Sequence, residues 1–297
     1  MIKEIERVKS NDGSSKYLFN GGKNENDNFE ALYFYPVDNV QKSSICISTQ
    51  VGCGVGCAFC ATGKLGLSRN LKSVEMLEAI AKILEKEKEE GEELSKLDSI
   101  ALMGMGEPLH NYNEVREFYH KARELLPVSH VSLSTSGVTD KIIKLANDDT
   151  NYNLLFSLHS PFNDERNKIM PINRRYPLES VIRACEYYYK KKQKDSLGWK
   201  IKASYLLLDG FNDSDKHIEE LIKILDRDVF KVQILLYNEN EKLPFKRPSI
   251  EKARSFEKKL NENGLETKIS ISKGQDIAGA CGQMAGKKKI KEIVDER

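Results

Sequence analysis

The sequence predicts an α/β protein built from parallel βα units, and two patterns support this fold class. Short apolar runs typical of buried strands recur along the chain, and segments with helical periodicity fill the gaps between them. Strands that alternate with helices form parallel units with right-handed crossovers. About six such units in 297 residues fit a partial or full parallel barrel, with an open doubly wound sheet as the alternative.

The expected elements follow the apolar pattern along the chain. Strands are expected, by residue number, at 16–19, 29–35, 44–49, 98–103, 130–134, 153–158, 200–208, 230–237 and 266–272. Helices are expected at 114–126, 178–192, 215–225 and 250–263, and one more begins at Ser73 as its N-cap, with Met76, Leu77, Ile80, Ile83 and Leu84 on one face. The continuation of that helix, 85–93, is mostly Glu and Lys and is expected to be its solvated end. In either architecture ligands bind at the carboxyl ends of the strands, where the unusual residues of this chain fall.

The composition is that of an ordinary globular protein. Hydrophobic residues make up 39% of the chain and charged residues 31%, with a mean hydropathy of -0.53. No stretch approaches the ~18 apolar residues of a membrane span and the opening has no signal-peptide core, so we expect a cytoplasmic protein without membrane contact. The net charge of +2 neither proves nor excludes a nucleic-acid partner. We expect an N-terminal extension with short strands at 1–43, a core at 44–286 and a basic tail at 287–297.

Six cysteines are the main chemical signal, and four of them lie within fifteen residues. They are Cys46, Cys53, Cys57, Cys60, Cys185 and Cys281. Such a cluster in an intracellular protein indicates metal binding or catalysis rather than a disulfide scaffold. Cys185 lies in the amphipathic helix expected at 178–192 and reads as an ordinary buried cysteine.

The spacing Cys53-x3-Cys57-x2-Cys60 predicts an iron–sulfur cluster with one open iron. Three thiolates leave one iron of a cubane cluster without a protein ligand, where most clusters take four. Gly52, Gly54 and Gly56 allow the tight turns of such a loop. The alternative is a structural zinc site, but no histidine lies within forty residues on either side to complete it. A ferredoxin-type centre would need further cysteines, and none follow in a suitable spacing.

This loop, with Phe59 before its last cysteine, resembles the radical-SAM superfamily. The resemblance implies that Cys53, Cys57 and Cys60 hold a 4Fe-4S cluster whose open iron binds S-adenosylmethionine. It implies a partial (β/α)6 barrel, here with a short N-terminal β extension. It also implies an electron donor such as flavodoxin or ferredoxin.

More of the chain, from about Phe29 to about Gly286, resembles one branch, the radical-SAM RNA adenine methyltransferases of the RlmN/Cfr family. The matching pieces are 46–50, the cluster loop, 103–109, 133–137, 157–160, 170–173 and 276–283. The resemblance implies that Gly106 and Glu107 contact the methionine part of S-adenosylmethionine. Ser134, Ser157, Leu158, His159 and Asn238 would complete that pocket. A hydrogen-bonded core residue is the alternative for His159, but its place among polar residues at a strand end favours ligand contact.

The resemblance assigns the transfer chemistry to Cys46, Cys281 and Glu30. One S-adenosylmethionine methylates Cys281 and a second supplies the radical, so two are used per turnover. The thiolate of Cys46 then releases the product through a transient disulfide with Cys281, and Glu30 removes the ring proton. Strand alternation agrees for Cys46, because Cys46 and Ser48 share one face while Ile45 and Ile47 share the other. Two buried apolar cysteines are the alternative reading of Cys46 and Cys281.

The resemblance leaves the substrate open. Family members usually begin with a helical domain that helps grip RNA, and only 45 residues precede Cys46 here, so we expect a truncated member. RNA, either ribosomal or transfer RNA, is the expected partner; a non-RNA substrate and a relative without turnover are alternatives. Pro108 after Glu107 favours carbon 2 of adenine, and Ser160-Pro161 after His159 resembles the carbon-8 enzymes. A monomer is expected.

Overall fold

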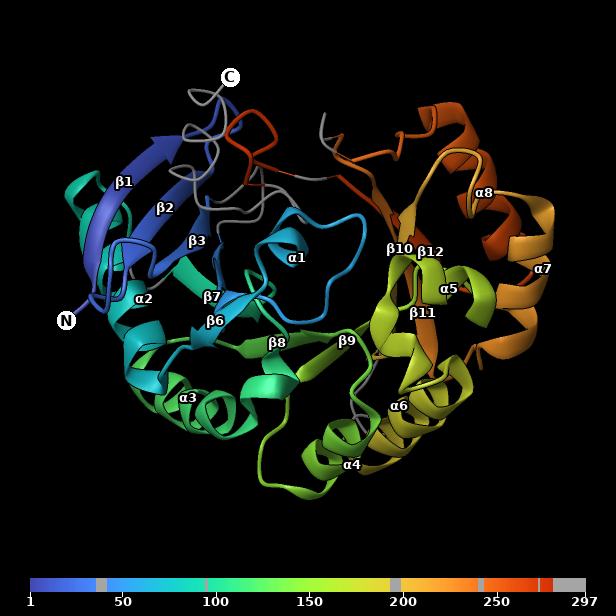
Figure 1. The fold of residues 1–297 in the computed structure, drawn as a ribbon, viewed down its shortest axis with the longest axis horizontal. Coiled ribbons are helices and arrows are strands. Elements are labelled where there is room, and N and C mark those ends of the chain that lie inside the picture. Colours follow the sequence, from blue (N-terminus) through green and yellow to red (C-terminus); the bar gives the residue numbers. More distant parts are fainter. Residues whose placement is uncertain (36–41, 94–95, 193–198, 240–242, 272, 280–297) are drawn as a thin grey trace. The chain divides into compact units, whose positions relative to one another are not determined.

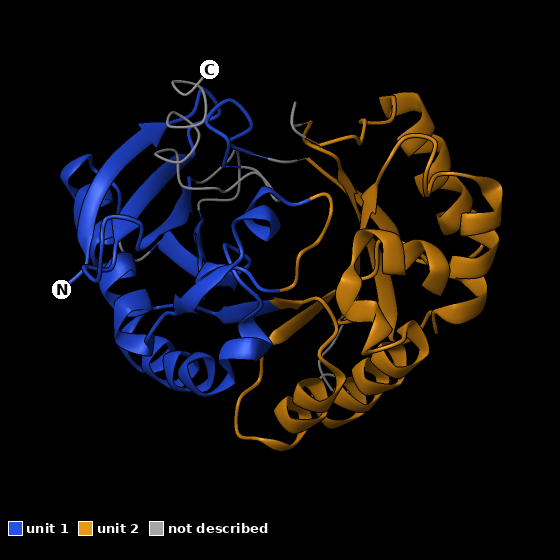
Figure 2. Ribbon diagram, in the orientation of Figure 1, with its two compact units in different colours: residues 1–54, 60–133, 273–297 blue, residues 55–59, 134–272 orange. Residues whose placement is uncertain are grey.

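The computed structural model describes the chain except residues 36–41, 94–95, 193–198, 240–242, 272 and 280–297. The chain divides into two compact units (Figure 2). Unit 1 comprises Met1–Gly54, Cys60–Leu133 and Lys273–Arg297, and unit 2 comprises Val55–Phe59 and Ser134–Ser272. Both chain ends therefore belong to unit 1.

Unit 1 joins an antiparallel β extension to parallel strands (Figure 1). Strands β1 (Lys3–Lys9), β2 (Ser15–Asn20), β3 (Asn28–Phe34) and β4 (Ser43–Ile47) pair antiparallel in that order. Strand β4 then pairs in parallel with β7 (Leu97–Leu102), which pairs in parallel with β8 (His130–Thr135). Strand β4 is thus the point where the extension meets the parallel core.

The remaining elements of unit 1 surround these strands. They are the hairpin of β5 (Gln50–Gly52) and β6 (Leu67–Asn70), helices α1 (Ala61–Leu65), α2 (Ser73–Glu89) and α3 (Tyr112–Leu125), and the 3-10 turn η2 (Pro108–Asn111). Helix α2 forms because an apolar stripe recurs at helical spacing, and Met76, Ile80 and Ile83 on that stripe are fully buried.

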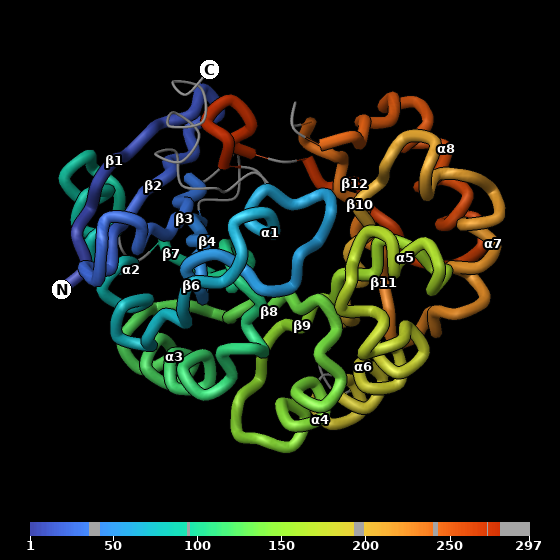
Figure 3. Tube along the Cα trace, viewed as in Figure 1, coloured from blue at the N-terminus to red at the C-terminus, as the bar shows by residue number. Residues whose placement is uncertain are grey.

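Unit 2 is a regular strand–helix alternation, which can be followed along the trace in Figure 3. Strands β9 (Asn153–Ser157), β10 (Ile201–Leu207), β11 (Phe230–Leu236) and β12 (Thr267–Ser270) pair in parallel in that order. The helices are α4 (Thr139–Asn147), α5 (Asn163–Ile169), α6 (Leu178–Lys192), α7 (Asp215–Ile224) and α8 (Ile250–Glu262), with the 3-10 turn η3 (Pro171–Arg174). Strands β9 and β10 are mostly buried, as parallel strands covered on both faces require, whereas β11 alternates buried and half-buried residues.

The α/β fold class and the expected strands are confirmed, and two details of helix α2 are corrected. Its N-cap is Lys72 rather than Ser73, because Glu75 accepts a hydrogen bond from the Lys72 backbone N–H at 2.7 Å. The stretch expected to be solvated contains Glu87, which is 1% exposed and bonds the hydroxyls of Tyr17 and Tyr35 and the guanidinium of Arg7. Within the described part of the chain, no helix has the length and apolar character needed to cross a membrane.

Candidate active site

A glycine-hinged hairpin positions the first cysteine of the cluster loop. The Cys53 backbone N–H donates to the carbonyl of Gly66 at 2.9 Å, immediately after β5. Gly52 has φ 78°, and a Cβ there would lie 2.0 Å from the Gly66 oxygen. Only glycine can therefore occupy this position without displacing the backbone of the hairpin.

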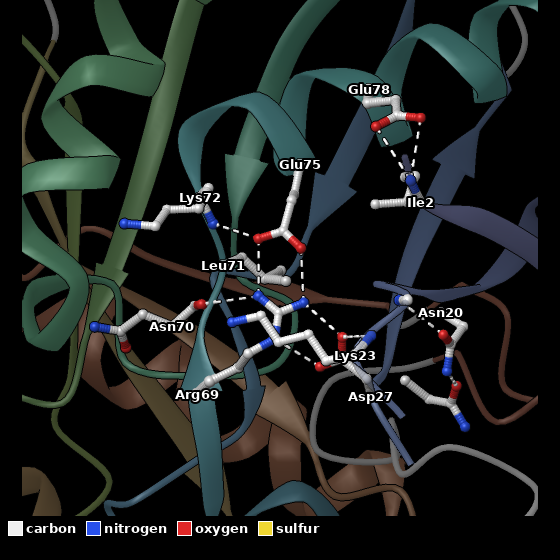
Figure 4. Close-up of polar contacts among 12 residues, drawn as sticks. Ile2, Asn20, Lys23, Asp27, Arg69, Asn70, Leu71, Lys72, Glu75 and Glu78 are labelled. Carbon is white, nitrogen blue, oxygen red and sulfur yellow. Dashed lines mark hydrogen bonds and ion pairs between the residues drawn. The ribbon is translucent and has the colours of Figure 1, made fainter. Parts of the chain in front are cut away.

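Arg69 anchors this hairpin to the rest of unit 1 (Figure 4). Its guanidinium lies between two carboxylates, with nitrogen–oxygen distances of 2.6 and 2.8 Å to Asp27 and of 2.6 and 2.8 Å to Glu75. Paired bonds of this kind fix both position and orientation. On the partner strand the Gln50 amide donates to the Asn70 side chain at 2.7 Å. The two strands of this hairpin flank the cluster loop; β6 is anchored by Arg69, and the bond between Gln50 and Asn70 links β5 to β6.

The middle of the loop is attached within unit 2. The Ala58 backbone N–H donates to the carbonyl of Ile169 at 2.8 Å, and the Phe59 ring packs edge-on against His159 with centroids 4.9 Å apart. These contacts hold Ala58 and Phe59, the two residues between Cys57 and Cys60. The cluster loop is therefore fixed by contacts with residues outside it.

The three loop thiols suit an iron–sulfur cluster in chemistry and accessibility. Cys53, Cys57 and Cys60 are half-buried thiols, so a bound group can reach them. Soft thiolate donors are the usual ligands of such clusters. Among the described residues, no group of three or more His, Cys, Asp or Glu side chains is placed to hold a metal ion.

Two glycines and Glu107 lie where the end of β7 meets the end of β4, all within unit 1. A Cβ at Gly104 would lie 2.7 Å from the Ser48 backbone nitrogen, and Gly106 has φ 104°. Glu107 is 3% exposed; its backbone N–H donates to Gln50 Oε1 at 2.9 Å, and its own Oε1 accepts from the Leu109 N–H at 3.0 Å. The missing side chains of Gly104 and Gly106 let Ser48 and Gln50 pack closely against this backbone, and the Glu107 carboxylate is fixed beside it.

Asn111, which was not predicted from the sequence, connects two of the backbone segments near these strand ends. Its side-chain amide donates to the carbonyls of Thr49 and Leu71 at 2.9 and 2.7 Å. A buried amide that bonds two separate segments carries no pattern that can be read from the sequence.

His159 lies in unit 2 with the other expected pocket residues Ser134, Ser157, Leu158 and Asn238. It is 4% exposed, has φ 56°, and accepts the Leu206 N–H at Nδ1 at 2.9 Å. Burial, with a smaller contribution from the positive charge of Arg166, lowers the pKa of His159 to about 3. The imidazole is therefore neutral, with its proton on Nε2.

Arg166 organises the strand ends around His159 and was not predicted. This fully buried guanidinium donates to the carbonyls of Ser136, Ser157 and Leu158 at 2.8, 2.8 and 3.0 Å, and to Asn173. Burial lowers its pKa to about 10, so it remains charged at neutral pH. It fixes the backbone of Ser157 and Leu158, two of the expected pocket residues.

The residues expected to transfer the methyl group belong to unit 1. Cys46 is a buried thiol, and it pairs in register with Leu32 of β3. The carbonyl of Glu30, two residues earlier on β3, accepts from Ser48 Oγ at 2.6 Å. Cys281 lies outside the described residues, but Gly279 packs against Leu32. Cys185 is fully buried in α6, and burial raises the pKa of its thiol, as expected of a core cysteine.

Comparisons with known proteins agree with this picture. Residues 47–223 match the family model described as the radical SAM superfamily. A probable dual-specificity RNA methyltransferase RlmN from Finegoldia magna is 38% identical over 82% of this chain and 67% of its own length. The dual-specificity RNA methyltransferase RlmN from Syntrophobacter fumaroxidans is 34% identical, over 94% of this chain and 79% of its own. A crystal structure of a radical SAM methyltransferase from Sphaerobacter thermophilus is 35% identical, over 95% of this chain and 80% of its own, with a TM-score of 0.86.

Proposed function

Because this chain belongs to the radical SAM superfamily and within it to the RlmN methyltransferases, we propose that it methylates a ring carbon of adenine in RNA through a methyl-carrier cysteine. The chain is an S-adenosylmethionine-dependent radical methyltransferase. The carrier, the choice of carbon and the residue roles are the proposal.

Cys53, Cys57 and Cys60 would hold the 4Fe-4S cluster, which when bound supplies the electron that splits S-adenosylmethionine. Gly106 and Glu107 would bind the methionine part, since the carboxylate of Glu107 can accept from an ammonium and Gly106 directly precedes it in the chain. Ser134, Ser157, Leu158, His159 and Asn238 would complete the pocket. A neutral His159 with its proton on Nε2 can donate one hydrogen bond to a ligand.

The observation that carries the proposal is the approach of the segment preceding Cys281 to strand β3. Gly279, which precedes Cys281 by two residues, packs against Leu32, and Leu32 pairs with Cys46. Glu30 lies two residues before Leu32 and therefore on the same face of the strand. The proposed resolving thiol and base therefore share the sheet face that the segment leading to Cys281 approaches.

The chemistry explains why two thiols are needed. A ring carbon between two nitrogens is electron-poor, so it does not accept a methyl cation directly. Cys281 would carry the methyl group as a thioether, which requires two molecules of S-adenosylmethionine per turnover. The 5′-deoxyadenosyl radical would abstract a hydrogen atom from this methyl group, and the resulting carbon radical would add to the ring carbon. The adduct would give up one electron, for which the cluster is the acceptor, and Glu30 would remove the ring proton. The thiolate of Cys46 would then attack the Cys281 sulfur, forming a transient disulfide as the sulfur–carbon bond breaks, and the released carbon would take up a proton to become the methyl group.

Carbon 2 of adenine is the proposed position, with ribosomal or transfer RNA as the substrate. Pro108 after Glu107 supports carbon 2, whereas Ser160 and Pro161 after His159 are the feature in favour of carbon 8. The electron would come from a flavodoxin or ferredoxin. A non-RNA substrate for the same two-cysteine chemistry is the second candidate.

The Cys46→Ala variant tests the proposal. Without the resolving thiolate the reaction should stop after the carbon–carbon bond forms, leaving RNA covalently attached to Cys281. We expect a protein–RNA band that survives denaturation, and nuclease digestion should leave a methylene-linked adenosine on the Cys281 peptide, whose fragmentation identifies the modified carbon.

Two further variants serve as controls. Cys46→Ala/Cys281→Ala should form no adduct, because the carrier acts first. Cys185→Ala removes a buried cysteine that has no proposed role and should turn over normally. Normal methylation by Cys46→Ala or by Cys281→Ala would overturn the carrier mechanism, and an adduct with a small molecule in place of RNA would favour the second candidate.

A further inference from the structure

The N-terminal strands contact the segment 274–279, and both lie outside the part of the chain that matches the radical SAM superfamily. The superfamily match covers residues 47–223, whereas strands β1–β3 end at Phe34 and the described C-terminal segment begins at Lys273. Both ends belong to unit 1. An interaction between two segments beyond the shared core points to a task other than radical generation.

The turn between β1 and β2 binds the C-terminal segment 274–279 through charge-assisted hydrogen bonds. Asp12 Oδ2 accepts from the Gly274 N–H at 2.6 Å, and Asp276 accepts from the Asn11 N–H at 2.9 Å and from the Ser10 hydroxyl. Burial opposes the charge on Asp12, but hydrogen bonds from Ser14 and Gly274 outweigh it and lower the pKa of this carboxyl to about 2. The contact is thus made by ionised carboxylates bonded to backbone N–H groups.

Deeper in the same contact, Lys16 connects the C-terminal segment to Glu30. The Lys16 ammonium is buried, donates to the Ala278 carbonyl at 3.3 Å and lies 3.9 Å from Glu30 Oε1. Lys16 pairs with Leu32 on β3, which in turn pairs with Cys46 on β4. Paired residues share a sheet face, so Lys16 lies on the same face as Glu30 and Cys46.

The backbone of the segment is shaped for this contact. Ala278 has φ 49°, a left-handed conformation that alanine rarely adopts, and its carbonyl is the group that Lys16 binds. A Cβ at Gly279 would lie 2.5 Å from the Leu32 side chain, so the chain passes close to β3 there. Strain of this kind persists only where the surroundings enforce it.

We propose that the β1–β3 extension is a docking platform for the segment that leads to the methyl-carrier Cys281, and that Lys16 is the positioning residue that sets this segment against Glu30. The proposal rests on the function proposed for Cys281 and adds a role for the extension. The turn at residues 10–12 holds the rim of the segment, and Lys16 holds its inner end. Methyl transfer then depends on the platform, whereas radical generation does not.

Hydrogen exchange and activity measured together test this proposal. We compare two variants, Lys16→Met and Asp12→Ala/Asp276→Ala. The first leaves the buried Glu30 carboxylate without its cation, whereas the second changes only exposed carboxylates at the rim of the contact. Loss of charge-assisted bonds should speed amide exchange across 274–279 by about tenfold in either variant. Misplacement of the carrier should lower RNA methylation by about 10²-fold, while the yield of 5′-deoxyadenosine without RNA stays within about twofold.

Asp226→Ala is the matched control, because exposed Asp226 accepts from the N–H two residues later just as Asp12 does, but in unit 2. It should change neither readout. Unchanged exchange across 274–279 in both test variants would overturn the platform, as would faster exchange with full methylation. Full methylation by Cys281→Ala would instead overturn the carrier while leaving the exchange result intact, so the two failures are distinguishable.

Discussion

At the scale of single residues, His159 shows how burial sets a protonation state. The folded protein holds the pKa of this imidazole near 3, whereas the unfolded chain has the ordinary value of 6.5. The unfolded chain therefore binds the extra proton first as the pH falls. Its contribution to stability is fully present above pH 6.5 and is lost between pH 6.5 and about 3.

We predict that His159→Asn flattens the acid dependence of stability. Asparagine tolerates the left-handed φ and can accept the Leu206 N–H, but it does not titrate. The wild type should lose up to about 1.4 kcal/mol of unfolding free energy per pH unit in this window because of His159 alone. Denaturant titrations at several pH values, under anaerobic conditions, measure the slope. A slope for His159→Asn equal to that of the wild type would contradict the assignment.

At the scale of elements, the apolar pattern predicted most strands and most long helices. It did not predict strands that are very short or contain few apolar residues. Strand β1 alternates charged residues with a few apolar ones, and β5 and β6 are three and four residues long, too short for a periodic signal. Glu87 lies in a stretch that was expected to be solvated. It is buried because Arg7, Tyr17 and Tyr35 of the N-terminal extension bond its carboxylate. Such contacts are tertiary, so no local pattern reveals them.

The junction of β4 and β7 gives a prediction about packing. Replacing Gly104 by Ala would place a methyl group 2.7 Å from the Ser48 backbone nitrogen, and backbone cannot rotate away as a side chain can. We expect Gly104→Ala to lose about 2 kcal/mol of unfolding free energy, as overpacking does. Gly54→Ala is the matched control, because its added Cβ meets only the Leu67 side chain, at 3.5 Å. Equal stability of the two variants in denaturant unfolding would show that the strand ends can separate.

At the scale of the whole molecule, the reactive groups of the candidate site are proposals made from sequence motifs, whereas the residues that support them are found only in the structure. Cysteines at a fixed spacing can be recognised in a sequence, and so can glycines next to a carboxylate. Arg166, Asn111 and Lys16 cannot, because each acts by donating hydrogen bonds to backbone carbonyls that are distant in the sequence. The docking of residues 274–279 on the extension belongs to the same class.

The six cysteines of the chain allow a final prediction about metal content. Three are assigned to the cluster, two to methyl transfer and Cys185 to the core. Protein prepared without oxygen should be brown, with about four irons per chain, and should cleave S-adenosylmethionine when reduced. Cys53→Ala, Cys57→Ala and Cys60→Ala should each lose the iron, since three thiolates already leave one iron open. Cys46→Ala and Cys185→Ala should keep it. Iron analysis and the visible spectrum decide the matter: one equivalent of zinc in place of iron, with no cleavage, would mean that the loop is a structural zinc site.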